Sequence, residues 1–278
     1  MSEHALKQID ANGLTIGYRE AGPKDRGMHE PIVFLHGIGS GSAGWTNQLD
    51  HFGTHHRAIA WDAPGYGGSG DLEGECPGTA AYADALAGLL DALDIESAHL
   101  VGNSLGSLFA GAFAGRHRAR VRSLLLSDPA IGHGEADPET REKSLKMRLD
   151  GVYIDGPAKM AEARAAKLVG PNTGEDVLEA VRAVMRQVRP DGYAQAARTL
   201  SQGNIFADLE GCDAPTLVVS GAEDIVTPPE GGRRIADALV NGRFVLLDGL
   251  GHLPYVEAPE RFNTVLSDFL AEQERVAA

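Results

Sequence analysis

Short, wholly apolar runs recur along this chain, and they predict strands that are buried on both faces. The run Ile32–Leu35 (IVFL) is the clearest, because neither of its faces carries a polar side chain. Central strands of a parallel sheet have this composition. The predicted strands are Leu14–Glu20, Pro31–Leu35, Arg57–Trp61, His99–Val101, Val121–Leu126, Thr216–Ser220 and Arg243–Leu247.

Segments with helical spacing of apolar residues alternate with these strands. The predicted helices cover Thr79–Leu93, Leu105–Ala114, about 230–239 and about 259–272. Strands that alternate with helices form a parallel sheet joined by right-handed crossovers. We therefore expect an α/β protein with a mostly parallel central sheet flanked by helices.

The alternation is interrupted between residues 132 and 208. This stretch is rich in Arg, Lys, Glu and Ala, and Gly–Pro pairs divide it into several predicted helices. We expect residues 1–131 and 209–278 to form the α/β core and residues 132–208 to form a helical cap, or lid, inserted between two core strands. The alternative is a surface excursion without a role.

Composition and charge exclude several classes of protein. The 278 residues are 43% hydrophobic, which suits one large buried core, and the formal charge of −14 argues against binding nucleic acid. No apolar run is long enough to cross a bilayer. The polar, partly acidic start does not resemble a secretory signal, so we expect a cytoplasmic protein. Cys76 and Cys212 are expected to be reduced structural thiols.

The strongest chemical signal is the segment Gly102–Gly106 (GNSLG), a GxSxG pattern directly after a predicted strand and directly before a predicted helix. A serine on such a sharp turn is held in a strained conformation that projects its hydroxyl from the sheet. Flanking glycines remove side chains that would collide there. Ser104 is thus the candidate nucleophile, and the alternative is a tight turn with an idle serine.

A serine nucleophile needs a base, and His252 is the best-placed histidine because it follows the strand Arg243–Leu247 in a loop. His36 also follows a strand, but its neighbours suggest a different role. The cluster of His51, His55 and His56 lies at a probable helix end, where a solvated patch is a better interpretation than a metal site.

The base in turn needs a carboxylate that fixes its tautomer. Asp224 follows the strand Thr216–Ser220 and precedes His252, which gives the order Ser, Asp, His along the chain. Glu223 is adjacent, but only one of two successive side chains can point inward. Asp128 remains a competitor, because it too follows a strand.

An oxyanion that forms during acyl transfer needs two N–H donors already in place. We expect one from the backbone of Leu105 and the other from Ile38, in the glycine-rich loop that starts at His36–Gly37. A plain glycine-rich turn is the alternative. The loop lacks the features of a dinucleotide or phosphate site, and the sequence implies no cofactor and no metal.

Five motifs together resemble the ordered signature blocks of bacterial α/β-hydrolases, across nearly the whole chain: LHGIGSGSAGW, WDAPGYGGSG, LVGNSLGS, GAEDIVTP and GHLPYVEAPERF. The resemblance implies a triad of Ser104, Asp224 and His252, and a lid formed by residues 132–208. The tail of the chain is similar to that of 3-oxoadipate enol-lactonases. The glycine-rich loop followed by Trp45, and Asn103 before the nucleophile, look like the meta-cleavage product hydrolases, which split C–C bonds in ring-fission products.

The expected substrate is a small molecule that contacts Gly37, Asn103 and Leu253. The resemblance to C–C hydrolases matches Arg182 to a lid arginine that grips a substrate carboxylate, although a solvated helix face explains the lid arginines equally well. That subgroup usually has an aromatic residue after the catalytic histidine, where this chain has Leu253.

Three functions follow in order of preference. The first is hydrolysis of an ester or lactone, the second is C–C bond hydrolysis, and the third is ligand binding without catalysis on the same fold. The substrate can be anionic, no nucleic acid or membrane partner is expected, and a homo-oligomer is left open.

Overall fold

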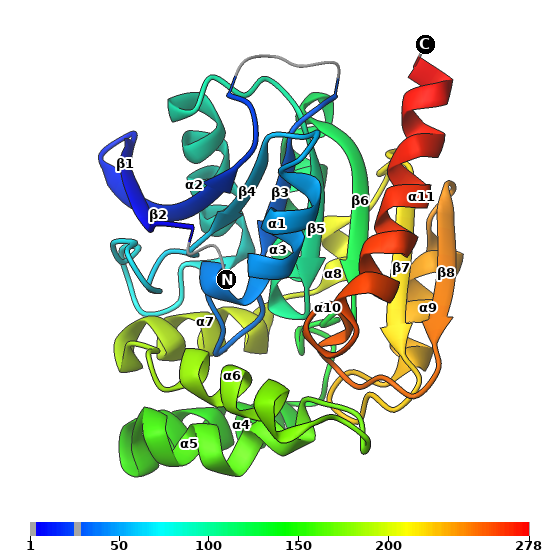
Figure 1. Cartoon of the computed structure of the whole chain (residues 1–278). Helices are drawn as coiled ribbons and strands as arrows, with labels where there is room; N and C mark the ends of the chain where they lie inside the picture. The colour runs from blue at the N-terminus through cyan, green and yellow to red at the C-terminus, as the bar shows by residue number, and fades with distance from the viewer. Residues whose placement is uncertain (1–3, 25–28, 278) are drawn as a thin grey trace.

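A computed structural model describes residues 4–24 and 29–277. Its central feature is an eight-stranded sheet in the order β1-β2-β4-β3-β5-β6-β7-β8 (Figure 1). Strands β1 and β2 pair antiparallel at one edge, β2 pairs antiparallel with β4, and all other pairs are parallel. The strands are β1 (Lys7–Ala11), β2 (Leu14–Ala21), β3 (Ile32–Leu35), β4 (Ala58–Trp61), β5 (Ala98–Asn103), β6 (Val121–Ser127), β7 (Thr216–Gly221) and β8 (Gly242–Leu247). The mostly parallel α/β architecture predicted from the sequence is confirmed.

The apolar runs form the centre of the sheet, as their composition predicts. Every residue of β3, β4, β5 and β7 is buried, whereas the edge strand β1 alternates between partly buried and exposed positions. Helices pack on both faces of the sheet and exclude water from these strands. Burial on both faces explains why apolar runs, rather than alternating ones, marked the strands.

Two helical layers cover the sheet (Figure 1). Helices α1 and α11 contact each other on one face, and α2, α3, α8 and α9 form a chain of contacts on the other. The helices of these layers are α1 (Thr46–Phe52), α2 (Gly78–Ala92), α3 (Leu105–Arg116), α8 (Ile205–Asp208), α9 (Pro229–Ala238) and α11 (Pro259–Ala277). Short helical turns add η1 (Ser42–Trp45), η2 (Arg118–Arg120) and α10 (Pro254–Glu257). No helix in the described ranges is both long and apolar enough to cross a membrane.

A group of inserted helices lies between β6 and β7 in the chain and below the carboxyl ends of the strands in Figure 1. The inserted helices are α4 (Pro138–Asp150), η3 (Gly151–Asp155), α5 (Gly156–Arg164), η4 (Ala165–Lys167), α6 (Glu175–Met185) and α7 (Pro190–Gln202). They occupy the stretch in which the sequence predicts helices and no strand. Helix α7 holds them to the core, because the Gln195 amide donates to the carbonyls of Leu72 (2.8 Å) and Gly74 (2.6 Å).

Candidate active site

Ser104 sits on a strained turn between β5 and α3. Its φ of 53° and ψ of −116° fall outside the regions that side-chain-bearing residues normally adopt. The flanking glycines make the turn feasible: a Cβ on Gly102 would lie 2.5 Å from the carbonyl oxygen of Gly106, and one on Gly106 would lie 2.0 Å from that of Leu35. The Ser104 N–H donates to the Ser127 carbonyl (2.9 Å), which ties the turn to β6.

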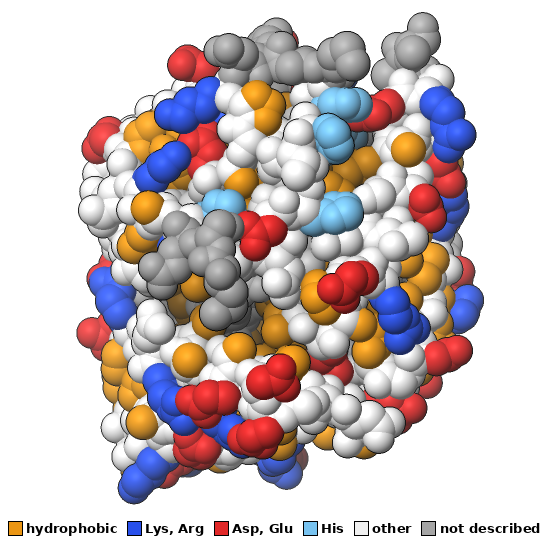
Figure 2. Space-filling view, viewed as in Figure 1, with side chains coloured by type: hydrophobic (Ala, Val, Ile, Leu, Met, Phe, Trp, Pro, Cys, Tyr) orange, Lys and Arg blue, Asp and Glu red, His pale blue; other side chains and the backbone are white. Residues whose placement is uncertain are grey.

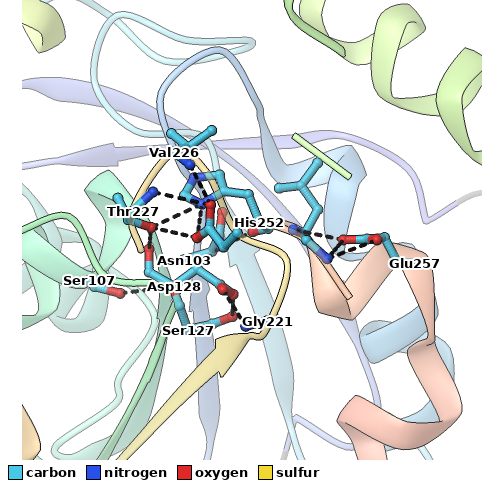
Figure 3. A network of polar contacts seen from close by, with 12 residues as sticks. Asn103, Ser107, Ser127, Asp128, Gly221, Val226, Thr227, His252 and Glu257 are labelled. Atoms are coloured by element: carbon cyan, nitrogen blue, oxygen red, sulfur yellow. Dashed lines mark hydrogen bonds and ion pairs between the residues drawn. The ribbon is translucent and has the colours of Figure 1, made fainter. Parts of the chain in front are cut away.

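His252 and Asp224 form a buried hydrogen-bonded pair on loops that follow β8 and β7. Figure 3 labels His252 and Thr227 in this network. His252 Nδ1 lies 2.8 Å from Asp224 Oδ2, so the carboxylate accepts the Nδ1 proton and leaves Nε2 as a proton acceptor. The Thr227 hydroxyl lies 2.7 Å from Asp224 Oδ2 and 3.1 Å from His252 Nδ1. The structure thus brings the predicted base and its predicted orienting acid together.

Hydrogen bonds keep the Asp224 carboxylate ionised despite its burial. Burial acts to raise its pKa, but the hydrogen bond and charge of His252, with donors from Thr227 and Val226, outweigh it and lower the pKa below the usual value. The Val226 N–H lies 2.7 Å from Oδ1. An ionised carboxylate in this position stabilises the positive charge that the imidazole gains when it takes a proton.

Asp128 lies beside this pair and is fully buried at the end of β6. Its Oδ1 accepts the Gly221 N–H (2.8 Å), and its Oδ2 lies 2.7 Å from the Ser127 hydroxyl. Burial and the neighbouring Asp224 carboxylate raise the pKa of Asp128 well above its usual value, while the donors from Gly221 and Ser127 oppose this only in part. The hydrogen bond to the His252 ring is made by Asp224, which favours Asp224 over Asp128 as the orienting acid.

A carboxylate that the sequence analysis missed holds the His252 loop. Glu257 accepts hydrogen bonds from the backbone N–H groups of Gly251 (3.0 Å) and Leu253 (3.2 Å), on either side of the histidine. It also accepts the N–H of Gly170 (2.7 Å), which lies among the inserted helices. Figure 3 shows Glu257 beside the histidine loop. The only signal in the sequence was its place five residues after His252, which does not reveal a backbone acceptor.

The two residues expected to supply the oxyanion donors lie close to Ser104 in the structure. Leu105 is the first residue of α3, where a backbone N–H has no acceptor within the helix. In the glycine-rich loop, His36 Nδ1 donates to the Gly37 carbonyl (2.8 Å) and Nε2 accepts the Ala63 N–H (3.0 Å). Because a trans peptide directs its C=O and N–H to opposite sides, the Ile38 N–H points away from the His36 ring. A Cβ on Gly37 would lie 3.1 Å from the Ser104 Cβ, so this peptide is close to the nucleophile.

His36 connects the Gly37 carbonyl to the Ala63 backbone through its two ring nitrogens. Burial lowers its pKa, against the opposing effects of the Gly37 carbonyl and the Asp62 charge, so the ring stays neutral with one donating and one accepting nitrogen. Asn103 has a comparable role behind the nucleophile. It is fully buried, and its amide donates to the His252 carbonyl (3.1 Å) while its side chain also borders the cavity described next.

A cavity of about 650 Å³ opens at Ser104 and His252. Helix α6 supplies much of its apolar wall, and the wall contains no Asp or Glu among the described residues. Arg19 of β2 is its one Lys or Arg; its Nε is buried without a hydrogen-bond partner in the described ranges. The predicted contact residues Gly37, Asn103 and Leu253 line the cavity, and so does Ile38, a predicted oxyanion residue.

The expectation for Arg182 is wrong. Arg182 does not line the cavity among the described residues, and its guanidinium pairs with Glu175, Glu162 and Glu179. At 3.6 residues per turn, the cavity-lining residues Ala180, Val181, Val184 and Met185 occupy one face of α6, which leaves Arg182 on the other. Arg182 is thus held by carboxylates on the cap and is only 16% exposed, so neither a substrate contact nor a solvated helix face describes it.

Comparison with known proteins decides the family. The sequence model of the family described as "alpha/beta hydrolase fold" matches residues 30–259 of the chain. The chain belongs to the α/β-hydrolase family. It is a hydrolase enzyme by this membership, and its eight-stranded, mostly parallel sheet is the fold of the family.

Individual relatives of this α/β-hydrolase cover nearly its full length. A 2-hydroxy-6-oxononadienedioate/2-hydroxy-6-oxononatrienedioate hydrolase from Paraburkholderia phymatum is 33% identical over 87% of this chain and 88% of its own. The structure of a thermophilic esterase from Thermogutta terrifontis superposes with a TM-score of 0.86 and 27% identity. The match covers 97% of this chain and 99% of the esterase chain. The structure of an enol-lactonase from Burkholderia xenovorans LB400 superposes with a TM-score of 0.85 and 26% identity. The match covers 95% of this chain and 100% of the enol-lactonase chain.

Proposed function

We propose that this α/β-hydrolase cleaves a carboxylic ester or lactone of a small molecule through an acyl-serine intermediate. The observation that carries the proposal is the shared cavity of the strained Ser104 and of His252, whose Nδ1 is held 2.8 Å from the buried Asp224 carboxylate. A weak hydroxyl nucleophile becomes effective when an oriented base removes its proton. The likeness to an esterase and an enol-lactonase supports the same bond type.

The proposed reaction has two halves. Ser104 Oγ attacks the substrate carbonyl carbon while His252 Nε2 takes the hydroxyl proton, and the N–H groups of Leu105 and Ile38 bind the oxyanion. When the intermediate collapses, the C–O bond to the leaving group breaks and His252 protonates that oxygen. Water then attacks the acyl-serine as His252 removes a proton from it, which releases the carboxylic acid and restores Ser104.

The inserted helices act as the cap of this site in our proposal. Helix α6 lines the cavity with Val181, Val184 and Met185, which suits an apolar acyl group. Arg19 is the cation that would meet an anionic group on the substrate. The Arg19 Nε, which has no hydrogen-bond partner among the described residues, would gain a charge-assisted hydrogen bond when a carboxylate binds.

The test uses p-nitrophenyl acetate and a fluorophosphonate probe. Ser104→Ala is expected to lower kcat by about 10⁴ or more and to abolish labelling, with unchanged circular dichroism. The matched control is Ser267→Ala, a serine of α11 outside the cavity, which should retain full activity. A wild-type enzyme that neither turns over the ester nor reacts with the probe would overturn the proposal.

The second candidate is C–C bond hydrolysis of a ring-fission product. It is favoured by the 33% identity to the Paraburkholderia phymatum hydrolase. Steady-state assays with an enol-lactone and with a ring-fission dienoate separate the two functions, since each reaction has its own chromophore. A kcat/KM higher for the dienoate than for the lactone would replace our first proposal with this one.

A further inference from the structure

A second cavity lies at the amino ends of strands β3 and β4, whereas Ser104 lies at the carboxyl ends of the strands. Its volume is about 560 Å³. Its polar lining residues are His29, Asp50, His51, Thr54, His55, His56, Ser267 and Glu274. In Figure 2, histidine side chains gather near the top of the view beside an acidic side chain, far from the cap. The catalytic mechanism uses none of these residues.

Three of these side chains converge more closely than the rest. His29, His56 and Glu274 each bring one ligand atom within 4.8 Å of the other two. His29 Nδ1 lies 2.5 Å from Glu274 Oε1, and the centroids of the two histidine rings are 4.8 Å apart. The three residues come from the segment before β3, the segment before β4 and helix α11. Such convergence of distant segments is a property of the fold rather than of local sequence.

A hydrogen bond to the backbone leaves one ring nitrogen of His56 available to bind a metal. Its Nδ1 lies 3.0 Å from the Glu30 carbonyl oxygen, which can only accept, so Nδ1 carries the proton and Nε2 has the lone pair. Metal-bound histidines usually make this second contact to a backbone carbonyl or carboxylate.

We propose that His29, His56 and Glu274 form a binding site for zinc, separate from the catalytic site. Two imidazoles and one carboxylate are a common donor set for zinc, and water would complete the tetrahedron. Bound zinc would link the amino ends of β3 and β4 to α11. The sequence favoured a solvated patch of His51, His55 and His56. In the structure His56 is buried, while His51 and His55 are exposed.

The test uses untagged, chelator-treated enzyme titrated with zinc chloride by calorimetry and with Co²⁺ by visible absorption. The wild type is expected to bind one equivalent of zinc, to show the intense bands of tetrahedral Co²⁺ and to gain in Tm. His56→Gln and Glu274→Gln should each weaken zinc binding roughly tenfold or more. The matched control is His55→Gln in the same cavity, which should change the affinity by less than about twofold.

Two outcomes would overturn the site. One is a wild type without a one-to-one zinc complex. The other is equal weakening by His55→Gln and His56→Gln, which would mean an unspecific histidine-rich surface. Hydrolase activity of each variant reports its folding, because the proposed site lies at the opposite sheet edge from Ser104. If His56→Gln does not fold, Glu274→Gln on the partly exposed end of α11 decides the question.

Discussion

The carboxyl group of Asp128 lies beside that of Asp224, with one oxygen of each and one His252 nitrogen all within 4.8 Å of one another. Two carboxylates at such a distance do not both ionise in a buried site. Their surroundings separate them, because Asp224 receives the donors of His252 and Thr227, whereas Asp128 is more deeply buried. We infer that Asp224 is ionised and that Asp128 keeps its proton at neutral pH.

Asp128→Asn is therefore expected to leave kcat within a few fold of wild type, because a neutral amide replaces a neutral acid of the same shape. Asp224→Asn should lower kcat by about 10³ to 10⁴, since the histidine loses its orienting charge. Parallel kcat measurements on the two variants check this. If Asp128→Asn cost as much as Asp224→Asn, Asp128 would be the orienting acid instead.

The same substitution changes how stability depends on pH. The pKa of Asp128 is raised in the folded state, so above the unfolded value of about 3.8 only the unfolded chain releases the proton. The contribution of Asp128 to the free energy of unfolding therefore decreases as the pH rises. Asp128→Asn removes this pH-dependent contribution. The free energy of unfolding of the variant relative to wild type should rise as the pH increases above about 4. Urea denaturation at several pH values measures it, and a difference that stays constant with pH would contradict a protonated Asp128.

Arg19 and Arg182 offer a matched pair for substrate charge. Arg19→Gln should lower kcat/KM for the anionic p-nitrophenyl hemisuccinate by about ten- to a hundredfold, because a charged hydrogen bond of about 1.5–3 kcal/mol is lost. The neutral p-nitrophenyl butyrate should change by less than about twofold. Arg182→Gln should affect neither ester, since that arginine lies outside the cavity. An equal loss of kcat/KM for both esters would mean that Arg19 contributes to the shape of the cavity but does not bind the negative charge of the substrate.

Glu257 positions the catalytic loop through its backbone. Glu257→Gln places an amide N–H₂ opposite N–H donors of Gly170, Gly251 or Leu253, so at least one donor loses its acceptor. We expect a loss of about 1–3 kcal/mol in the free energy of unfolding. We also expect a lower kcat with nearly unchanged KM, because His252 shifts while the cavity wall remains. A variant that lost stability but kept the wild-type kcat would show that Glu257 is only structural.

The sequence was sufficient for the residues whose neighbours along the chain define them. Ser104, Asp224 and His252 each follow an apolar strand, and parallel strands bring their carboxyl ends to one edge. The strand Lys7–Ala11 was missed because it is a half-exposed edge strand with a weak apolar pattern. Of helix α1 the sequence indicated only the end, near His51, because the helix has only seven residues.

Contacts between distant segments could not be predicted in this way. Arg19 reaches the cavity from β2, the strand next to the edge strand β1, and its role depends on where the loop after β3 lies. His29 and Glu274 are separated by 245 positions, so no local pattern relates them. For Arg182 the error was of another kind, because the resemblance supplied a role while the helix face that carries the arginine was not considered.

Gly37 tests whether the loop beside Ser104 supplies an oxyanion donor. A Cβ at this position would lie 2.9 Å from Asn103 Oδ1 and 3.1 Å from the Ser104 Cβ, so Gly37→Ala must displace the Gly37–Ile38 peptide or the nucleophile. Loss of one oxyanion donor lowers kcat by about 10² to 10³, and we expect a decrease approaching that range with little change in Tm.

The matched control is Gly41→Ala in the same loop. Gly41 has an extended φ of −173°, and a Cβ there would make only an ordinary contact, 3.4 Å from Asp62 Oδ1. Its kcat should stay close to the wild-type value, because the peptide next to Ser104 does not move. If both alanines lowered kcat equally, general stiffness of the loop, rather than the position of the Ile38 N–H, would limit the rate, and the second donor would have to be sought elsewhere.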